Sequence, residues 1–127
     1  MAQTRLANPQ VLINNNPIAI VANSLTFKEG LGEQNVTIQS AGGNHIETVY
    51  SEDVSTRMSM VKFDLASTEQ NIELIRNWKL ARNENAIVVT GTEFTRTFTN
   101  MALITDYEVG LGNDSVISLE FHGDPAV

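Results

Sequence analysis

The stretch STEQNIELIRNWKLAR, residues 67–82, decides how the rest of the chain is interpreted. Leu74 and Trp78 lie one helical turn apart on an apolar stripe, while glutamates come early and basic residues late, as the helix dipole favours. Ser67 and Gln70 have the spacing of a capping box. The stretch therefore predicts one amphipathic helix that begins at an N-cap Ser67 and packs Trp78 against a sheet.

On both sides of this helix, apolar and polar residues alternate, which is typical of half-buried strands. Before the helix the strand-like segments are 11–13, 18–22, 25–28, 36–39, 46–51 and 58–65. After it they are 86–89, 94–99, 101–104, 107–109 and 116–121, with a bulge expected near Asn100. The polar pair Glu52-Asp53 between two of these segments predicts a long hairpin across 45–65, with Phe63 among its core residues.

Some adjoining segments, such as 94–99 and 101–104, continue into one another, so we expect about eight or nine short strands and one helix, which predict a mainly β fold. We expect a β-barrel or a two-sheet sandwich whose opening the helix covers, because one open sheet of that many strands would expose its edges. A chain of 127 residues favours a single domain. We expect an N-terminal arm, residues 1–16, that contains one short strand and becomes ordered on assembly, followed by one β-barrel domain, residues 17–127.

The composition excludes several classes of protein. The chain has no cysteine, so disulfides, thiolate metal sites and cysteine nucleophiles are ruled out. A net charge of −7 argues against a basic surface that would bind nucleic acid. No apolar run reaches the roughly 18 residues of a membrane span, and residues 1–10 lack the apolar core of a signal peptide. We expect a protein that stays in the cytoplasm in which it is made and contacts no membrane.

Residue patterns that carry catalysis or bind metals are not recognisable. His45 and His122 have no second ligand at a metal-binding spacing, and no G-x-S-x-G elbow occurs. Gly30-Leu31-Gly32 precedes no helix, which argues against a phosphate loop. We therefore expect no enzyme, no metal and no cofactor. A carbohydrate-binding sandwich remains an alternative that would require a row of exposed aromatic residues, and a small hydrolase remains a weaker one.

The order of these segments resembles the tail tube proteins of contractile-tailed bacteriophages. The resemblance runs along residues 17–125 and is carried by NSLTFKEG (23–30), TVYSEDVS (48–55), NIELI (71–75), NMALI (100–104), DYE (106–108) and VISLEFHGDP (116–125). It implies a β-barrel-like subunit with one flanking helix, whose hexameric rings stack into a hollow tube that conducts DNA during genome ejection. The tube proteins of type VI secretion and other contractile injection systems share this fold and are the alternative.

The same resemblance implies partners and a place of action. The partners would be further copies of the chain and the sheath, tape-measure, baseplate and tail terminator proteins. DNA would pass through without specific binding, and the protein would reside in the virion tail after assembly in the host cytoplasm. An acidic lumen would repel DNA, which carries about one negative charge per 1.7 Å of duplex, and would let it slide.

Two groups of residues are candidates for these roles. The polar faces of alternating strands are lumen candidates: Glu47, Lys62, Asp64, Glu93, Thr95, Thr97, Asp106 and Glu108. The segment before the helix supplies the candidates for contacts to the next subunit or ring: Ser51, Glu52, Asp53, Val54, Arg57, Met58 and Met60. The two methionines face away from the core residues of their strand, so they either contact a neighbouring subunit or lie under a second layer formed by the N-terminal arm.

Overall fold

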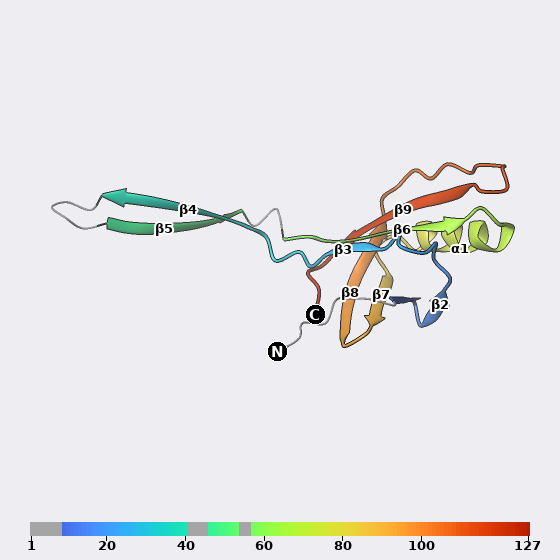
Figure 1. Ribbon diagram of the computed structural model, residues 1–127, viewed down its shortest axis with the longest axis horizontal. Helices are drawn as coiled ribbons and strands as arrows, with labels where there is room; N and C mark the ends of the chain where they lie inside the picture. The colour runs from blue at the N-terminus through green and yellow to red at the C-terminus, as the bar shows by residue number, and fades with distance from the viewer. Residues whose placement is uncertain (1–8, 41–45, 54–56) are drawn as a thin grey trace.

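The computed structural model describes residues 9–40, 46–53 and 57–127, and for residues 33–40 and 46–53 it describes the backbone alone. The predicted mainly β fold with one helix is confirmed (Figure 1). The elements in chain order are β1 (Gln10–Ile13), β2 (Asn16–Ile18), β3 (Thr26–Lys28), β4 (Glu33–Ser40), β5 (Ile46–Asp53), β6 (Ser59–Ala66), α1 (Glu69–Leu80), β7 (Asn85–Gly91), β8 (Phe94–Leu103) and β9 (Val116–Gly123).

Seven strands form one antiparallel sheet in the order β2-β1-β7-β8-β9-β6-β3, and the sheet folds over on itself. The fold occurs within β8, which pairs with β7 over most of its length and with β9 only at Ala102 and Leu103. Just before this change of partner Asn100 has a φ of 53°, and the register with β7 shifts by one residue between the pairs Ile87–Phe98 and Asn85–Met101. This confirms the bulge expected near Asn100, since an extra residue bends a strand and increases its twist.

The two layers enclose one hydrophobic core. Alternate residues of β6 are buried as predicted, and they lie opposite Ile117, Leu119 and Phe121 of β9. The rings of Phe63 and Phe121 stack with their centroids 5.8 Å apart. From the other layer, Phe98 reaches Phe27 across the core at 5.7 Å. Burial of these alternating rows is what holds the layers together.

Helix α1 closes one end of the sandwich. Trp78 packs its indole edge-on against Phe121 at 5.9 Å, which confirms its predicted role as the anchor of the helix. The predicted N-cap is wrong by one residue: the Thr68 side chain accepts a hydrogen bond from the Asn71 N–H, so the Ser67–Gln70 capping box is not formed. Ser67 instead donates its hydroxyl to the Gly110 carbonyl at 2.7 Å.

Other sequence-based expectations also need correction. The hairpin predicted across 45–65 is wrong, because β5 pairs with β4 and β6 pairs with β9 and β3. The strand expected at 18–22 ends at Ile18, and the segment 104–115 contains no strand in the described chain. The short strand expected at 11–13 is confirmed as β1, with Val11 and Ile13 buried in the core. Residues 1–8 of the expected N-terminal arm lie outside the described residues, and the division into an arm and a domain stays a prediction.

Candidate assembly surfaces

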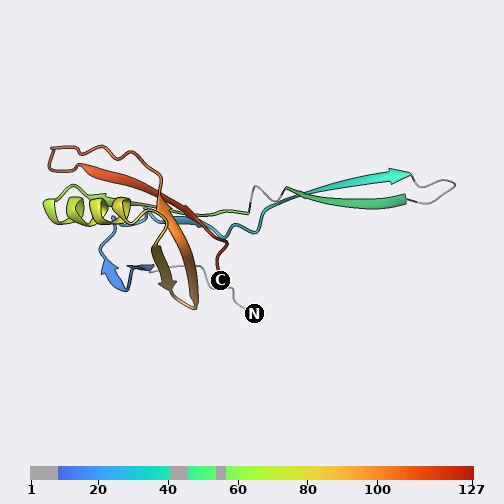
Figure 2. The same cartoon turned by 180° about the vertical axis from the view of Figure 1, so that it is seen from behind.

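A two-stranded ribbon projects from the sandwich. We call the pair β4 and β5 the arm; it is a different segment from the N-terminal arm, residues 1–16. Each of its strands has eight residues, which corresponds to a length of about 27 Å. Figures 1 and 2 show the arm extending away from the sandwich on the side opposite α1. Within the described residues its strands pair with each other and with no other strand. An isolated two-stranded hairpin is at best marginally stable in water, so contacts within the described residues contribute little to holding the arm in place.

The register of the arm sorts its residues onto two faces. Residues opposite each other in the ladder share a face, so Val36 and Ile38 share one with Tyr50 and Ile46. The other face carries Glu33, Asp53 and Glu47. By this register most of the apolar residues fall on the first face, together with Glu52, and three of the four acidic residues of the arm fall on the second.

The root of the arm is fastened to the sandwich. Gly30 has a φ of 81°, and a Cβ built there would lie 2.5 Å from the backbone nitrogen of Ser59. The neighbouring Glu29 forms an ion pair with Arg96 of β8, and its carbonyl accepts a hydrogen bond from the Ala126 N–H at 2.8 Å. The last residue, Val127, exchanges two backbone hydrogen bonds with Thr97. The C-terminal residues thus tie β8 to the point where the arm leaves.

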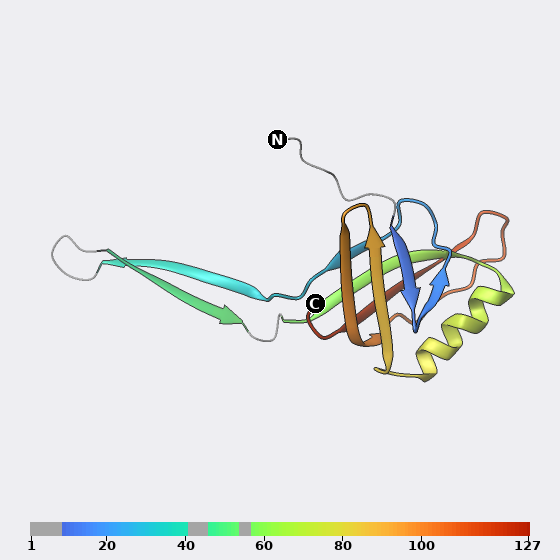
Figure 3. The same cartoon turned by 90° about the horizontal axis from the view of Figure 1, so that it is seen from below.

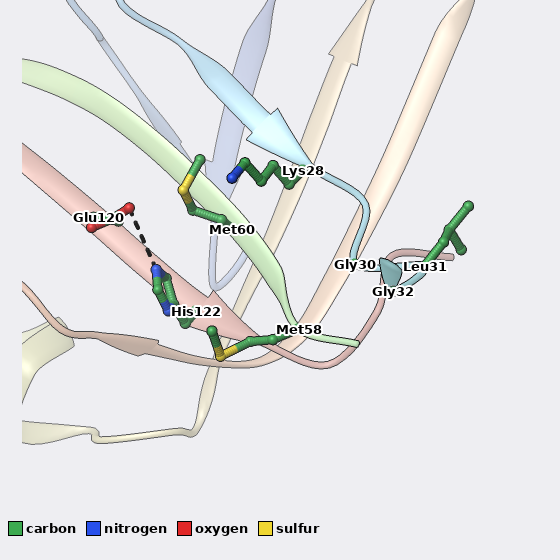
Figure 4. A pocket seen from close by; sticks show the side chains of 8 residues that line it. All are labelled: Lys28, Gly30, Leu31, Gly32, Met58, Met60, Glu120 and His122. Carbon is green, nitrogen blue, oxygen red and sulfur yellow. Dashed lines mark ion pairs between the residues drawn. The ribbon is translucent and has the colours of Figure 1, made fainter. Parts of the chain in front are cut away.

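A hollow of about 420 Å³ lies beside this root (Figure 4). Met58 and Met60 line it together with Lys28 from β3 and His122 from β9. The His122 Nε2 lies 3.4 Å from a Glu120 carboxylate oxygen, and this nitrogen is buried without a hydrogen-bond partner among the described residues. Among the described residues as a whole, no group of three or more His, Asp or Glu side chains is arranged so that it could hold a metal ion. The hollow offers two flexible thioethers and mixed charges, which suit a protein contact.

The outer face of β3, β6 and β9 brings together half of the lumen candidates. Lys62 and Asp64 lie on it in β6. The segment that follows β8 runs beside β9, because the Ile104 N–H donates to the Glu120 carbonyl at 3.0 Å and the Glu120 N–H donates to the Thr105 hydroxyl at 2.8 Å. Asp106 and Glu108 come next in this segment, and both are exposed. Sequence reasoning missed Glu120, which lies directly opposite Lys62 in the ladder.

The remaining lumen candidates lie elsewhere. Thr95 and Thr97 occupy the outer face of the other layer, opposite Thr90 and Val88 of β7. Glu93 has a φ of 61° in the turn that precedes β8, and Glu47 lies on the arm. The structure thus divides the candidates between two outward faces, a turn and the arm, and a role in lining a lumen stays a prediction for each group.

The candidates for contacts between subunits gather around the arm. Ser51, Glu52 and Asp53 form the end of β5 nearest the sandwich, and Val54 lies outside the described residues. Arg57 and Met58 come just before β6, where both are exposed, and Met60 is half-buried in β6. Whether any of them contacts a neighbouring copy stays a prediction.

The negative charge of the chain is concentrated in two protruding segments. Residues 33–53 contain four acidic residues and residues 104–115 contain three, and neither segment contains a lysine or arginine. The rest of the chain contains eight acidic residues and eight lysines and arginines, so these charges cancel. The seven acidic residues of the two segments therefore account for the whole net charge of −7. This segregation is visible in the sequence and could have pointed to both segments.

Comparison with solved structures links the fold to contractile injection machinery. A chain from the sheath–tube complex of the extracellular contractile injection system PVC in its extended state superposes with a TM-score of 0.56 and 11% identity, covering 94% of this chain and 86% of that one. A chain from the six-fold symmetrised baseplate of the anti-feeding prophage AFP gives a TM-score of 0.54 and 14% identity, covering 100% and 96%. These likenesses show the fold.

Comparison by sequence adds no relative. No family model matches the chain, and no curated protein matches it. Among the described residues, no helix is long and apolar enough to cross a membrane.

Proposed function

We propose that this chain is the structural subunit of a phage tail tube, in which hexameric rings stack into a hollow tube that conducts the DNA genome during ejection. The observation that carries the proposal is the arm, a two-stranded ribbon that leaves the sandwich and pairs with no other strand among the described residues. The fold shared with chains of two contractile injection systems supports it. Sheath, tape-measure, baseplate and terminator proteins would be the partners of such a tube.

We assign the bore to the outer face of β3, β6 and β9 with the adjoining residues 104–109. This surface carries four acidic residues against two lysines: Asp64, Asp106, Glu108 and Glu120 against Lys28 and Lys62. Charged groups resist removal from water, so this face is expected to stay hydrated. The uncharged, threonine-rich face of the β7–β8 layer is the easier one to cover with a neighbour.

The excess of negative charge suits the passage of DNA. A basic bore would bind the phosphate backbone at many sites, whereas an acidic one repels it and does not hold it. A protein cargo is the second candidate, favoured by the likeness to chains of extracellular injection systems. Both versions require the same assembly of rings and differ only in what passes through the bore.

Negative-stain electron microscopy of the concentrated full chain tests the proposal. We expect rings and stacked tubes with a central hole. A variant in which a short Gly-Ser linker replaces residues 33–53 should keep the folded sandwich, because the arm pairs only with itself among the described residues, but should form no tubes. Isolated particles of one subunit at every concentration of the wild-type chain would refute the proposal.

A further inference from the structure

Two methionines and one histidine share the hollow beside the root of the arm. We call Met58, Met60 and His122 the sulfur–imidazole cluster. Met60 of β6 lies directly opposite His122 of β9 in the antiparallel ladder, so their side chains leave the sheet on the same face. Met58 comes two residues before Met60, and all three side chains line the hollow. The fold therefore brings a histidine from near the end of the chain to a Met-Ser-Met segment.

The ends of two strands hold this cluster in place. Figure 3 shows β6 and β9 running side by side to the point where the arm leaves the sandwich. Ser59, between the two methionines, is buried, and its hydroxyl donates to the Met101 sulfur at 3.4 Å. Because successive side chains of an extended chain point to opposite faces, the burial of Ser59 turns Met58 and Met60 outward. Figure 4 shows the His122 ring between the two methionine side chains.

The imidazole of the cluster has an unused ligand atom. The His122 Nε2 is buried and lacks a hydrogen-bond partner among the described residues. A Glu120 carboxylate oxygen lies 3.4 Å away, but an ionised carboxylate only accepts hydrogen bonds and cannot satisfy the lone pair of a neutral imidazole. A buried polar atom without a partner is costly and calls for an explanation. A bound cation would satisfy this nitrogen.

We propose that the sulfur–imidazole cluster binds one soft monovalent cation, Cu(I), through the sulfurs of Met58 and Met60 and the Nε2 of His122. Thioether sulfur selects Cu(I) and imidazole suits copper, whereas Mg²⁺ and Ca²⁺ prefer oxygen ligands. Methionine has three rotatable bonds, so both sulfurs can adjust to the cation while the strands stay in place. The three ligands are neutral, and the Glu120 carboxylate beside Nε2 offsets the single positive charge.

The charges around the hollow favour a monovalent over a divalent cation. Lys28 of β3 lies opposite Met60 and lines the hollow together with Glu120. Lys62 lies opposite Glu120 on the next rung of the same face. One carboxylate beside two lysines leaves little negative charge to balance a second positive charge on the metal. We therefore expect Zn²⁺, which thiolate, imidazole and carboxylate ligands bind, to bind weakly here.

The chain supplies its own controls. It contains four methionines and two histidines. Met101 is fully buried in the core, so its methyl group should not respond to a cation in the hollow. His45 lies outside the described residues and is no part of the cluster. Its replacement removes one imidazole from the chain, as replacement of His122 does, and leaves the proposed ligands intact.

Titration of the dilute chain with Ag(I) in chloride-free buffer tests the site, because Ag(I) is a soft cation of the same charge as Cu(I) and is stable in air. In a chain labelled with ¹³C at the methionine methyl groups, the NMR signals of Met58 and Met60 should shift and saturate at one equivalent, while that of Met101 stays in place. Cu(I) kept reduced by ascorbate without oxygen should shift the same two signals.

Substitution of the ligands measures their contribution. Met58→Leu with Met60→Leu nearly conserves side-chain volume, and His122→Gln removes the imidazole. Each variant should weaken Ag(I) binding in isothermal titration calorimetry by more than about tenfold, since even the loss of a group that only supports a ligand costs about 10–100-fold. The control His45→Gln should bind Ag(I) as the wild-type chain does.

The outcomes decide the proposal. Saturation at one equivalent, together with weaker binding in the ligand variants alone, supports the site. Circular dichroism of each variant confirms that the sandwich is folded, and the double leucine variant decides by itself if His122→Gln does not fold. Unchanged Ag(I) affinity in the double leucine variant, no methyl shifts with Cu(I), or Zn²⁺ binding as tight as that of Ag(I) would overturn it. These measurements use single dilute chains, so the proposed function is tested separately.

Discussion

Substitution of Gly30 tests whether the root of the arm is held as tightly as the structure indicates. An alanine there would occupy left-handed backbone at a φ of 81° and place its Cβ 2.5 Å from the Ser59 nitrogen and 2.7 Å from the Met58 carbonyl carbon. Left-handed backbone costs a residue with a Cβ about 1–2 kcal/mol. Forcing an extra carbon against immobile backbone costs about 1–3 kcal/mol more.

We expect Gly30→Ala to lower the free energy of unfolding by about 2–5 kcal/mol, a large part of the 5–15 kcal/mol typical of a domain. Urea titration of the dilute chain, followed by fluorescence of the single buried tryptophan, measures it. Gly32→Ala is the matched control, because Gly32 also has a positive φ, of 87°, and should show at least the torsional part of about 1–2 kcal/mol. A loss at Gly30 below about 1 kcal/mol would refute this account of the root.

Three further predictions follow from named contacts. Thr68→Ala should cost about 1 kcal/mol of stability as a lost N-cap, whereas Ser67→Ala should leave helicity by circular dichroism unchanged and loosen the 104–115 segment in hydrogen exchange. Asn85→Ala removes a buried amide that donates to two carbonyls at the end of α1, so it should lower the free energy of unfolding, measured by thermal denaturation, by about 2–3 kcal/mol. A loss under about 0.5 kcal/mol would count against these hydrogen bonds. In assembled tubes, Lys62→Cys should react with a small maleimide but not with one larger than the bore, whereas Thr95→Cys should be protected from both; the reverse pattern would move the bore to the β7–β8 face, and the native chain, which has no cysteine, gives the blank.

Local patterns in the sequence determined which residues are buried and which elements form. Two patterns predicted the buried residues correctly: the alternation at Val61, Phe63 and Leu65, and the apolar stripe through Trp78. They could do so because the side chains of a strand or helix repeat with a fixed period, whichever element packs against them. The bulge at Asn100 was also readable, since a single asparagine interrupts two apolar segments there. The clustering of acidic residues in 33–53 and 104–115 likewise belongs to the sequence alone.

Only the tertiary structure decided which strands pair and what projects from the body. Alternation specifies the faces of a strand but not its neighbour, so β5 could be assigned to β6 although it pairs with β4. The choice is made by β6, whose buried row is matched by Ile117, Leu119 and Phe121 some fifty residues further along the chain. Once β9 and β3 occupy both sides of β6, β4 and β5 pair only with each other among the described strands, and the arm they form projects from the sandwich.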